Sequence, residues 1–287
     1  MDTVIYVSLV FIVFITLYPF YYTLVLSFNN GIDTSRGGVY FWPRVFTLEN
    51  YIQVFKDPAW GRASFISVSR TVIGTACTLI FSGLFAYGLS FDNLRFRKIY
   101  MSILLFSMYF SGGLIPYFVL LRALGLLNSF AVYIIPLLMD SFMVLIMIAF
   151  FKEIPRSLHE SAKIDGANDL IIFFRIILPT SKPVVATASL FMGVHQWNSW
   201  FDATFFVQRK DLKPMAFLLR EVINRAQLLS MREGATAVEM AMRSTSTVTS
   251  TSLQMATMIV AIVPIILVYP FAQKYFVKGV LLGSVKE

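Results

Sequence analysis

Six long apolar stretches alternate with polar ones along this chain of 287 residues. Each stretch is long enough to cross a hydrocarbon core of about 30 Å as a helix, which takes about 20 apolar residues. The pattern therefore predicts an all-α integral membrane protein in which residues 1–287 form a single domain of six transmembrane helices. The predicted spans are residues 4–28, 65–91, 99–121, 130–151, 184–206 and 253–270.

The loops between these spans set an expected orientation. Arg95, Arg97 and Lys98 crowd the short connection between the second and third spans. Basic residues concentrate in short cytoplasmic loops, so we expect this connection and both termini to lie inside. The long polar stretches 29–64 and 207–250 are then outer loops. The aromatic residues of the first outer loop are expected either at the headgroup level or against a partner protein.

Composition supports a membrane protein and excludes nucleic-acid binding. Hydrophobic residues make up 57% of the chain and charged residues 14%, with a mean hydropathy of +0.71. Soluble domains are about half apolar and about a quarter charged. The net charge of +8 is spread over short loops rather than gathered on one basic face. Such charges are typical of topology signals and of contacts with anionic lipid.

Catalytic and metal-binding patterns do not occur in the sequence. There is no Gly-x4-Gly-Lys-Ser/Thr loop for a nucleotide and no Gly-x-Ser-x-Gly nucleophile motif. His159 and His195 are too few and too distant for a metal pair, and Cys77 lies in an apolar run where it is expected to pack as a small hydrophobe. We therefore expect a chain without catalytic residues, bound metal or bound cofactor.

One strongly polar segment, residues 157–179, interrupts the middle of the chain. Pro155 blocks continuation of the preceding helix, and Ser157 with Glu160 three residues later forms a capping box that predicts a new helix from Ser157. Gly166 is the residue that bends at low cost. The segment is too polar and too short to span, so we expect it at the cytoplasmic surface, presented to another protein.

A second helix is predicted after the bend. It would run from Asn168 to Leu178 and would be closed by Pro179. The expected arrangement is therefore a helix, a bend and a helix.

These residues also carry a resemblance. Glu160-Ser161-Ala162, Gly166 and Ile176-Ile177-Leu178-Pro179 resemble the EAA-x3-G-x9-I-x-L-P signature of the permease subunits of ABC importers, with Ser161 in place of the first Ala. Asp165-Gly166-Ala167 is similar to the carbohydrate-uptake, MalG-like branch. The simpler alternative is that Glu160 only caps its helix and Gly166 only ends it.

The resemblance implies a type I, MetI-like permease fold whose two short helices couple to an ATPase subunit. The implied coupling residues are Ser157, Glu160, Ser161, Ala162, Lys163, Asp165, Gly166, Ala167, Leu178 and Pro179.

The C-terminal tail, residues 273–287, extends the resemblance. Its Lys274–Lys286 stretch looks like the closing segment of MalG-like permeases, which reaches between the two ATPases. This implies that Lys278, Gly279 and Gly283 contact the ATPases, and a flexible terminal peptide is the alternative. With residues 111–116 and 197–202, the last span and tail resemble most the LplC/YtcP-type permeases for complex oligosaccharides.

Polar and aromatic groups within the spans are candidates for a pathway. Facing lipid would be costly for them, so they are expected to line an interior surface. Aromatic rings can stack on sugars while amides and carboxylates bond hydroxyl groups, although packing against a sister permease is the alternative. The candidates are Tyr109, Gly112, Gly113, Gln196, Trp197, Asn198, Trp200 and Asp202. Asp140 is either a functional acid or an acceptor for a neighbouring subunit.

The resemblance implies a permease subunit of an ATP-driven sugar importer, with oligosaccharides as the expected cargo, in a bacterial cell membrane. The implied partners are a second homologous permease in a heterodimer, two ATPase subunits that bind ATP and Mg, an extracellular solute-binding protein, the sugar and membrane lipid. Two alternatives stay open, an ion-coupled secondary transporter and a membrane scaffold subunit. For the first, Asp140 would be the lone coupling acid, and no inverted repeat is visible.

Overall fold

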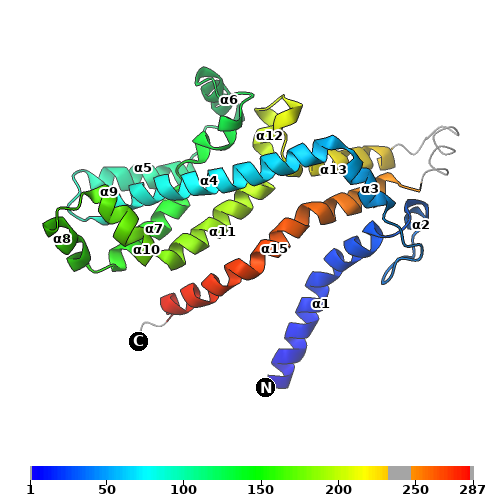
Figure 1. The fold of residues 1–287 in the computed structure, drawn as a ribbon, viewed down its shortest axis with the longest axis horizontal. Coiled ribbons are helices and arrows are strands. Elements are labelled where there is room, and N and C mark those ends of the chain that lie inside the picture. The colour runs from blue at the N-terminus through cyan, green and yellow to red at the C-terminus, as the bar shows by residue number, and fades with distance from the viewer. Residues whose placement is uncertain (1, 232–246, 285–287) are drawn as a thin grey trace. The chain divides into compact units, whose positions relative to one another are not determined.

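The computed structural model of the chain describes residues 2–231 and 247–284 (Figure 1). Within these residues the chain is helical, and its one β-type pairing is an isolated antiparallel bridge between Asn29 and Phe46. The predicted all-α fold is confirmed. The chain divides into two compact units, residues 1–64 with 213–267 and residues 65–212 with 268–287.

Among residues 2–231 and 247–284, three helices are long and apolar enough to cross a membrane. They are α1 (Asp2–Ser27), α4 (Pro58–Ser90) and the Ser250–Pro270 part of α15 (Ser250–Ser284). Three bent helix pairs meet the same criterion when the two members of each pair are taken together. The described residues therefore hold up to six candidate spans, in agreement with the six stretches seen in the sequence.

The bends show where the expected spans are not continuous. The predicted third span, 99–121, consists of α5 (Arg97–Tyr109) and α6 (Leu114–Ala123), which meet at 119°. Phe110 is extended, with φ −115° and ψ 122°, and Gly113 has φ +82°, a value that favours glycine. The run Ser111-Gly112-Gly113 therefore turns the backbone where the sequence predicts a straight helix.

The predicted fourth and fifth spans are also interrupted. The fourth starts with the 3₁₀ turns η1 (Phe130–Tyr133) and η2 (Ile135–Leu137) and continues at 45° as α7 (Ser141–Glu153). The fifth contains α11 (Lys182–Asn198) and, after a break, α12 (Phe201–Phe205). The 3₁₀ turn η4 (Lys210–Leu212) follows.

The last helix differs from the prediction at its end. The sequence predicts that the sixth span ends at Pro270, but α15 continues through it to Ser284. Pro270 has no backbone N–H to donate, and α15 continues past it without that one hydrogen bond. This difference makes α15 longer than the predicted span 253–270.

The core of the 65–212 unit forms where α4, α5, α7 and α11 meet the segment after the bend. That segment comprises α9 (Asp169–Ile172), the π-helical turn η3 (Phe173–Ile177) and α10 (Leu178–Thr180). Its Phe173 is fully buried against Met147 and Tyr87, and Gly83 of α4 allows close contact, because a Cβ there would lie 3.1 Å from Phe173 Cζ.

The other unit is held together around the end of α1. It contains α1, α2 (Gly31–Ser35), α3 (Glu49–Lys56), α13 (Met215–Met231) and the first part of α15. The side-chain amide of buried Asn50 donates to the carbonyl groups of Ser27 and Asn29, at 2.9 and 3.0 Å. These bonds order the loop that follows α1.

Candidate functional site

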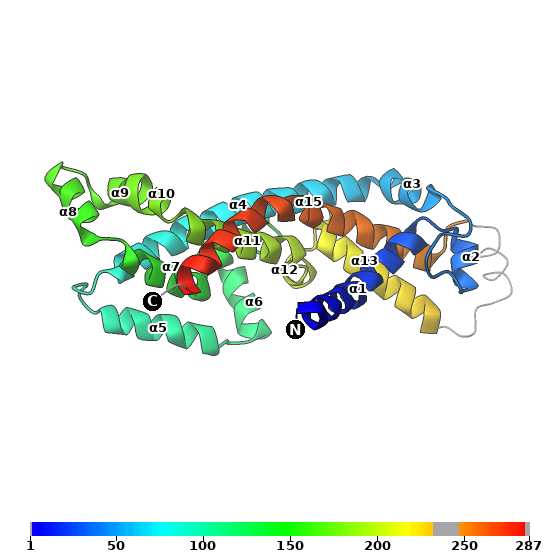
Figure 2. The same cartoon turned by 90° about the horizontal axis from the view of Figure 1, so that it is seen from below.

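The polar segment forms a bent element, called here the elbow (residues 155–180), whose first arm is α8 (Arg156–Ile164). Figure 2 shows it at one end of the 65–212 unit. The predicted capping box is wrong, because no side chain caps α8 and the helix begins one residue earlier than expected. Pro155 is the N-cap residue, and its carbonyl accepts from the Leu158 N–H at 3.2 Å. The first turn closes on this carbonyl, so Ser157 lies inside the helix.

The bend lies at Gly166, as predicted. Gly166 has φ +81°, its N–H donates to the Lys163 carbonyl, and the next N–H, of Ala167, donates to the Ala162 carbonyl at 2.9 Å. This is the Schellman pattern, which ends a helix with a left-handed residue that is usually glycine. Gly166 therefore both ends α8 and sets the direction of the second arm.

The second arm starts as predicted and ends later. Asn168 Oδ1 accepts from the Ile171 N–H at 2.8 Å and caps α9. The predicted end at Leu178 is wrong, because helical backbone continues through Pro179 to Thr180. In an α-helix the ring of Pro179 would clash with the carbonyl four residues earlier, and the wider π-helical turn before it relieves that crowding.

Interactions of one carboxylate, that of Asp169, connect the two arms of the elbow. Asp169 Oδ1, at the start of α9, lies 2.9 Å from Lys163 Nζ and 3.3 Å from His159 Nε2 of α8. The hydrogen bond from Lys163 is the main cause that lowers the pKa of Asp169. Edge-on packing against Phe91, at 5.0 Å between ring centroids, also holds the His159 ring. The angle of the elbow is therefore fixed by side chains as well as by Gly166.

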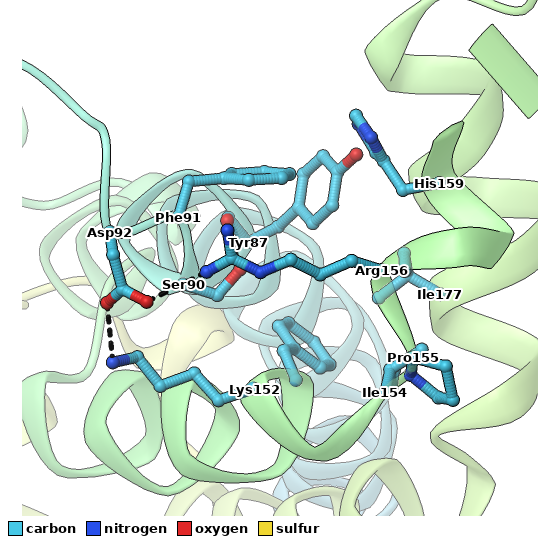
Figure 3. Close-up of a pocket in the computed structure, with 11 residues that line it drawn as sticks. Tyr87, Ser90, Phe91, Asp92, Lys152, Ile154, Pro155, Arg156, His159 and Ile177 are labelled. Atoms are coloured by element: carbon cyan, nitrogen blue, oxygen red, sulfur yellow. Dashed lines mark hydrogen bonds and ion pairs between the residues drawn. The ribbon is translucent and has the colours of Figure 1, made fainter.

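A second ion cluster ties the elbow to the ends of α4 and α7 (Figure 3). Asp92 lies 2.8 Å from both Lys152 Nζ and Arg156 Nη2, and 3.7 Å from Arg97. The hydrogen bond from Lys152 is the main cause that lowers the pKa of Asp92. Because Arg156 is the first residue of α8, this cluster connects α8 to the ends of α4 and α7.

A cavity of about 190 Å³ lies beside this cluster. Figure 3 shows Tyr87 and His159 on one side of it and Arg156 and Lys152 on the other. The hydroxyl of Tyr87 is buried and has no hydrogen-bond partner in the described part of the chain. Sequence reasoning did not single out Tyr87, because an isolated tyrosine in an apolar stretch is common.

The tip of the elbow exposes apolar side chains. Ile164 is 87% exposed, and Leu158 and Leu170 are exposed as well. Exposed apolar groups on an otherwise polar element mark an interaction surface. Of the predicted coupling residues, Ser157, Glu160, Ser161, Lys163, Asp165, Gly166 and Pro179 are exposed, Ala167 and Leu178 are half-buried, and Ala162 is buried in the core.

A polar cluster around Arg70 forms a second candidate region inside the 65–212 unit. Arg70 of α4 is fully buried, and its Nε and Nη2 donate to Gln196 Oε1 at 3.1 and 3.0 Å. Its Nη2 also pairs with Asp202 at 3.3 Å, its Nη1 donates to the Ser199 carbonyl at 3.0 Å, and the guanidinium lies 4.3 Å from the centre of the Tyr133 ring. Arg70 thus holds the break between α11 and α12 against α4.

Sequence reasoning missed Arg70. The available signal was a lone cation inside the predicted second span, since charges at membrane depth mark functional or structural centres. Gly74, one turn further along α4, leaves room for the cluster, because a Cβ there would lie 2.8 Å from Gln196 Cδ.

The predicted pathway residues do not lie together as a set. Gln196 and Asp202 are partners of Arg70, and Tyr109 is 80% exposed at the end of α5. The remaining candidates lie at or beside the two breaks in the helices, with Gly112 and Gly113 before α6, Trp197 and Asn198 at the end of α11, and Trp200 directly before α12.

Asp140 has a structural role within this chain. Its Oδ1 accepts from the Met143 N–H at 2.8 Å and caps α7, and its own N–H donates to Ser82 Oγ at 3.0 Å. An acceptor role thus has direct support within this chain, where the donor is the first turn of α7, and the contact with a neighbouring subunit stays a prediction.

The tail prediction stays untested. Lys278, Gly279 and Gly283 lie in the α15 backbone, but their side-chain environments are outside the described residues.

Comparison with known proteins agrees with this architecture. Residues 78–282 match the family described as binding-protein-dependent transport system inner membrane component. The chain is similar to the protein LplC of Bacillus subtilis (strain 168), with 37% identity over 95% of this chain and 90% of that protein. It is also similar to the polygalacturonan/rhamnogalacturonan transport system permease protein YtcP of the same organism. The two are 39% identical over 99% of this chain and 98% of that protein.

The chain is also similar to a solved structure of a transporter. It is the crystal structure of a bacterial ABC transporter involved in the import of the acidic polysaccharide alginate, and one of its chains superposes with a TM-score of 0.85. The two chains are 29% identical, and 96% of each is covered.

Proposed function

Because the chain belongs to the family of inner membrane components of binding-protein-dependent transport systems, we propose that its elbow couples it to an ATPase. The chain is a permease subunit of a sugar ABC importer. In the proposed mechanism the elbow docks on an ATPase subunit, and ATP-driven motion of that subunit moves α8. This chain supplies half of the translocation pathway and a second, homologous permease supplies the other half.

The observation that carries the proposal is the apolar tip of the elbow. Ile164 and Leu170 present exposed side chains from a short element that two ion clusters and a Schellman bend hold in place. An apolar group held rigidly on a polar element suits insertion into a pocket of a partner protein, because little conformational freedom is lost on binding.

The connection between α8 and the spans supports transmission of motion. Ala162 of α8 is buried in the same apolar cluster as Met147 of α7, Phe173 of η3 and Ala188 of α11. Well-packed interiors transmit displacement rather than absorb it. Movement of α8 would therefore carry these helices with it and change the shape of the pathway.

Oligosaccharides are the proposed cargo. The names of two similar proteins refer to polygalacturonan or rhamnogalacturonan and to alginate, which are polymers of acidic sugars. The half-buried Trp197 and Trp200 and the exposed Asn198 are the residues of this chain best suited to sugar contact, because Gln196 and Asp202 are occupied by Arg70. An extracellular solute-binding protein would deliver the sugar, and both termini would lie in the cytoplasm.

The ion-coupled alternative receives no support from Asp140. A coupling acid needs a carboxylate that exchanges partners during transport. Asp140 uses an oxygen to cap α7.

Co-purification with matched variants tests the proposal. Ile164→Glu should abolish capture of the ATPase and sugar-stimulated ATP hydrolysis, because it places a charge at the docking tip. Ile52→Glu changes an exposed isoleucine of α3 and should retain both. Retention of the ATPase by Ile164→Glu at the level of Ile52→Glu would overturn the proposal, and so would sugar uptake by the chain alone under an ion gradient.

A further inference from the structure

The loop between α2 and α3 carries an unusual run of apolar residues. Residues 37–43 read Gly-Gly-Val-Tyr-Phe-Trp-Pro and contain no charge. Tyr40 and Phe41 are exposed, and Trp42 is 78% exposed. Three neighbouring exposed aromatic side chains need either a protein partner or lipid to cover them.

The base of this loop is firmly held. Arg44 Nε donates to Asp33 Oδ2 at 3.0 Å and its Nη2 donates to the Gly37 carbonyl at 2.5 Å, so the cation that follows the aromatic run points back into the loop. Val39 is buried against Val25 and Leu26 at the end of α1. The aromatic side chains are therefore displayed from a fixed frame.

The depth of the loop follows from its contacts with α1. Tyr21 Oη donates to the Phe41 carbonyl at 2.5 Å, and the rings of Tyr18 and Phe41 are 6.2 Å apart. Tyr21 precedes Ser27, the last residue of α1, by six residues, which corresponds to about 9 Å along a helix. The loop therefore returns along the apolar helix instead of extending away from it, as Figures 1 and 2 both show.

From these contacts we propose that Tyr40, Phe41 and Trp42 form an interfacial anchor, inserted among the lipid headgroups at the C-terminal end of α1. In the part of the chain that the structure describes, no residue of the most apolar stretch of α1 is buried, so the loop lies against a surface suited to lipid. Tryptophan and tyrosine favour the headgroup level, where an apolar ring meets polar surroundings. The anchor is separate from the transport function and requires only that α1 spans the membrane.

Lipid-attached fluorescence quenchers test this depth. The transporter with its partner subunits is reconstituted into lipid nanodiscs, and the emission of Trp42 is obtained as the difference between the wild type and Trp42→Phe. A spin label near the glycerol backbone should quench that emission about twofold more than a label near the chain end, because the ring belongs at the interface. Aqueous iodide should quench it weakly. Trp60→Phe is the matched control, since Trp60 is 6% exposed and its emission should respond to none of the three quenchers.

Three results would overturn the anchor. Strong quenching of Trp42 by iodide without quenching by lipid labels would place the loop in water. Resistance to all three quenchers, or loss of lipid quenching when the solute-binding protein is added, would place a protein on the loop. Tyr40→Trp in the Trp42→Phe background supplies a second probe of the same loop and should report the same depth.

Discussion

Arg70 Nη2 lies 3.0 Å from Oε1 of Gln196, a residue 126 positions later in the chain, and both side chains are fully buried. One carboxamide oxygen thus accepts two bonds from one guanidinium. The Gln196 amide nitrogen in turn donates to the Tyr133 carbonyl at 3.2 Å, so three separate segments meet at one polar centre. Removal of any member leaves buried polar groups unpaired, which costs more than the net value of each bond.

Replacement of Gly74 by alanine tests how tightly this centre is packed. The new methyl group would lie 2.8 Å from Gln196 Cδ and would displace the side-chain amide from Arg70. We expect a destabilisation of about 1–3 kcal/mol, as is typical of overpacking. The measurement is the thermal unfolding midpoint of the purified transporter.

Gly61→Ala is the control for Gly74→Ala. Gly61 lies in the same helix α4, and a methyl group added there would meet no atom within 4 Å, so alanine should be neutral or slightly stabilising. Equal unfolding midpoints for the two variants would contradict the prediction. They would mean that the Gln196 side chain moves away from the added methyl group without a loss of stability.

The burial of Arg70 predicts a large difference between two similar ion pairs. Arg70 and Asp202 are 3.3 Å apart with the cation fully buried, whereas Arg44 and Asp33 are 3.0 Å apart with the cation half-exposed. Arg70→Met should cost about 3 kcal/mol because it removes one partner of a buried pair. Arg44→Met should cost about 1 kcal/mol or less because water already screens that pair. Thermal unfolding of both variants gives the comparison, and equal losses would contradict it.

Local signals in the sequence were sufficient to predict the elbow. Pro155 and Gly166 act through their own backbone preferences and Asn168 through its side-chain cap, so two arms and a bend at Gly166 appear as expected. The predicted start of α8 was one residue late. Ser157 and Glu160 have the spacing of a capping box, but their side chains do not cap the helix. The carbonyl of Pro155 closes the first turn instead.

Long-range partners were beyond the reach of the sequence. Arg70 meets Gln196 and Asp202 only through the packing of α4 against α11. No residue close to Arg70 in the sequence indicates that these two are its partners. The glycines at 112 and 113 indicated a weak point in the third span, but the 119° turn depends on the φ and ψ values of several residues together. The six apolar stretches were visible because hydropathy is local.

Acid should weaken the attachment of the elbow through Asp92. Its ion pairs lower its pKa below the ordinary value of about 3.9, so the stabilisation is fully present above that pH and is lost as the pH falls through the lowered value. The difference in unfolding midpoint between the wild type and Asp92→Asn should therefore be constant from about pH 5 to 7 and should shrink as the pH falls further and Asp92 becomes protonated in the folded protein.

Glu153→Gln is the control for this pH series. Glu153 is an exposed carboxylate next to Lys152 and forms no ion pair within the described part of the chain. Its variant should follow the wild type at every pH. A constant difference between the wild type and Asp92→Asn down to pH 3 would show that the charge of Asp92 does not stabilise the elbow.

The left-handed backbone of Gly166 predicts which substitutions the elbow tolerates. At φ +81°, asparagine is accepted at moderate cost, whereas a β-branched valine is strongly disfavoured. No atom lies within 4 Å of a Cβ at this position, so the difference between the two variants would reflect backbone conformation and not a clash.

Gly166→Asn should keep sugar-stimulated ATP hydrolysis within about threefold of the wild type, and Gly166→Val should lose at least about tenfold, as expected for a conformational cost above about 1.4 kcal/mol. Surface expression should stay similar for both variants, because Gly166 is exposed and outside the core. Equal activity of the two variants would show that the direction of the second arm does not matter for coupling.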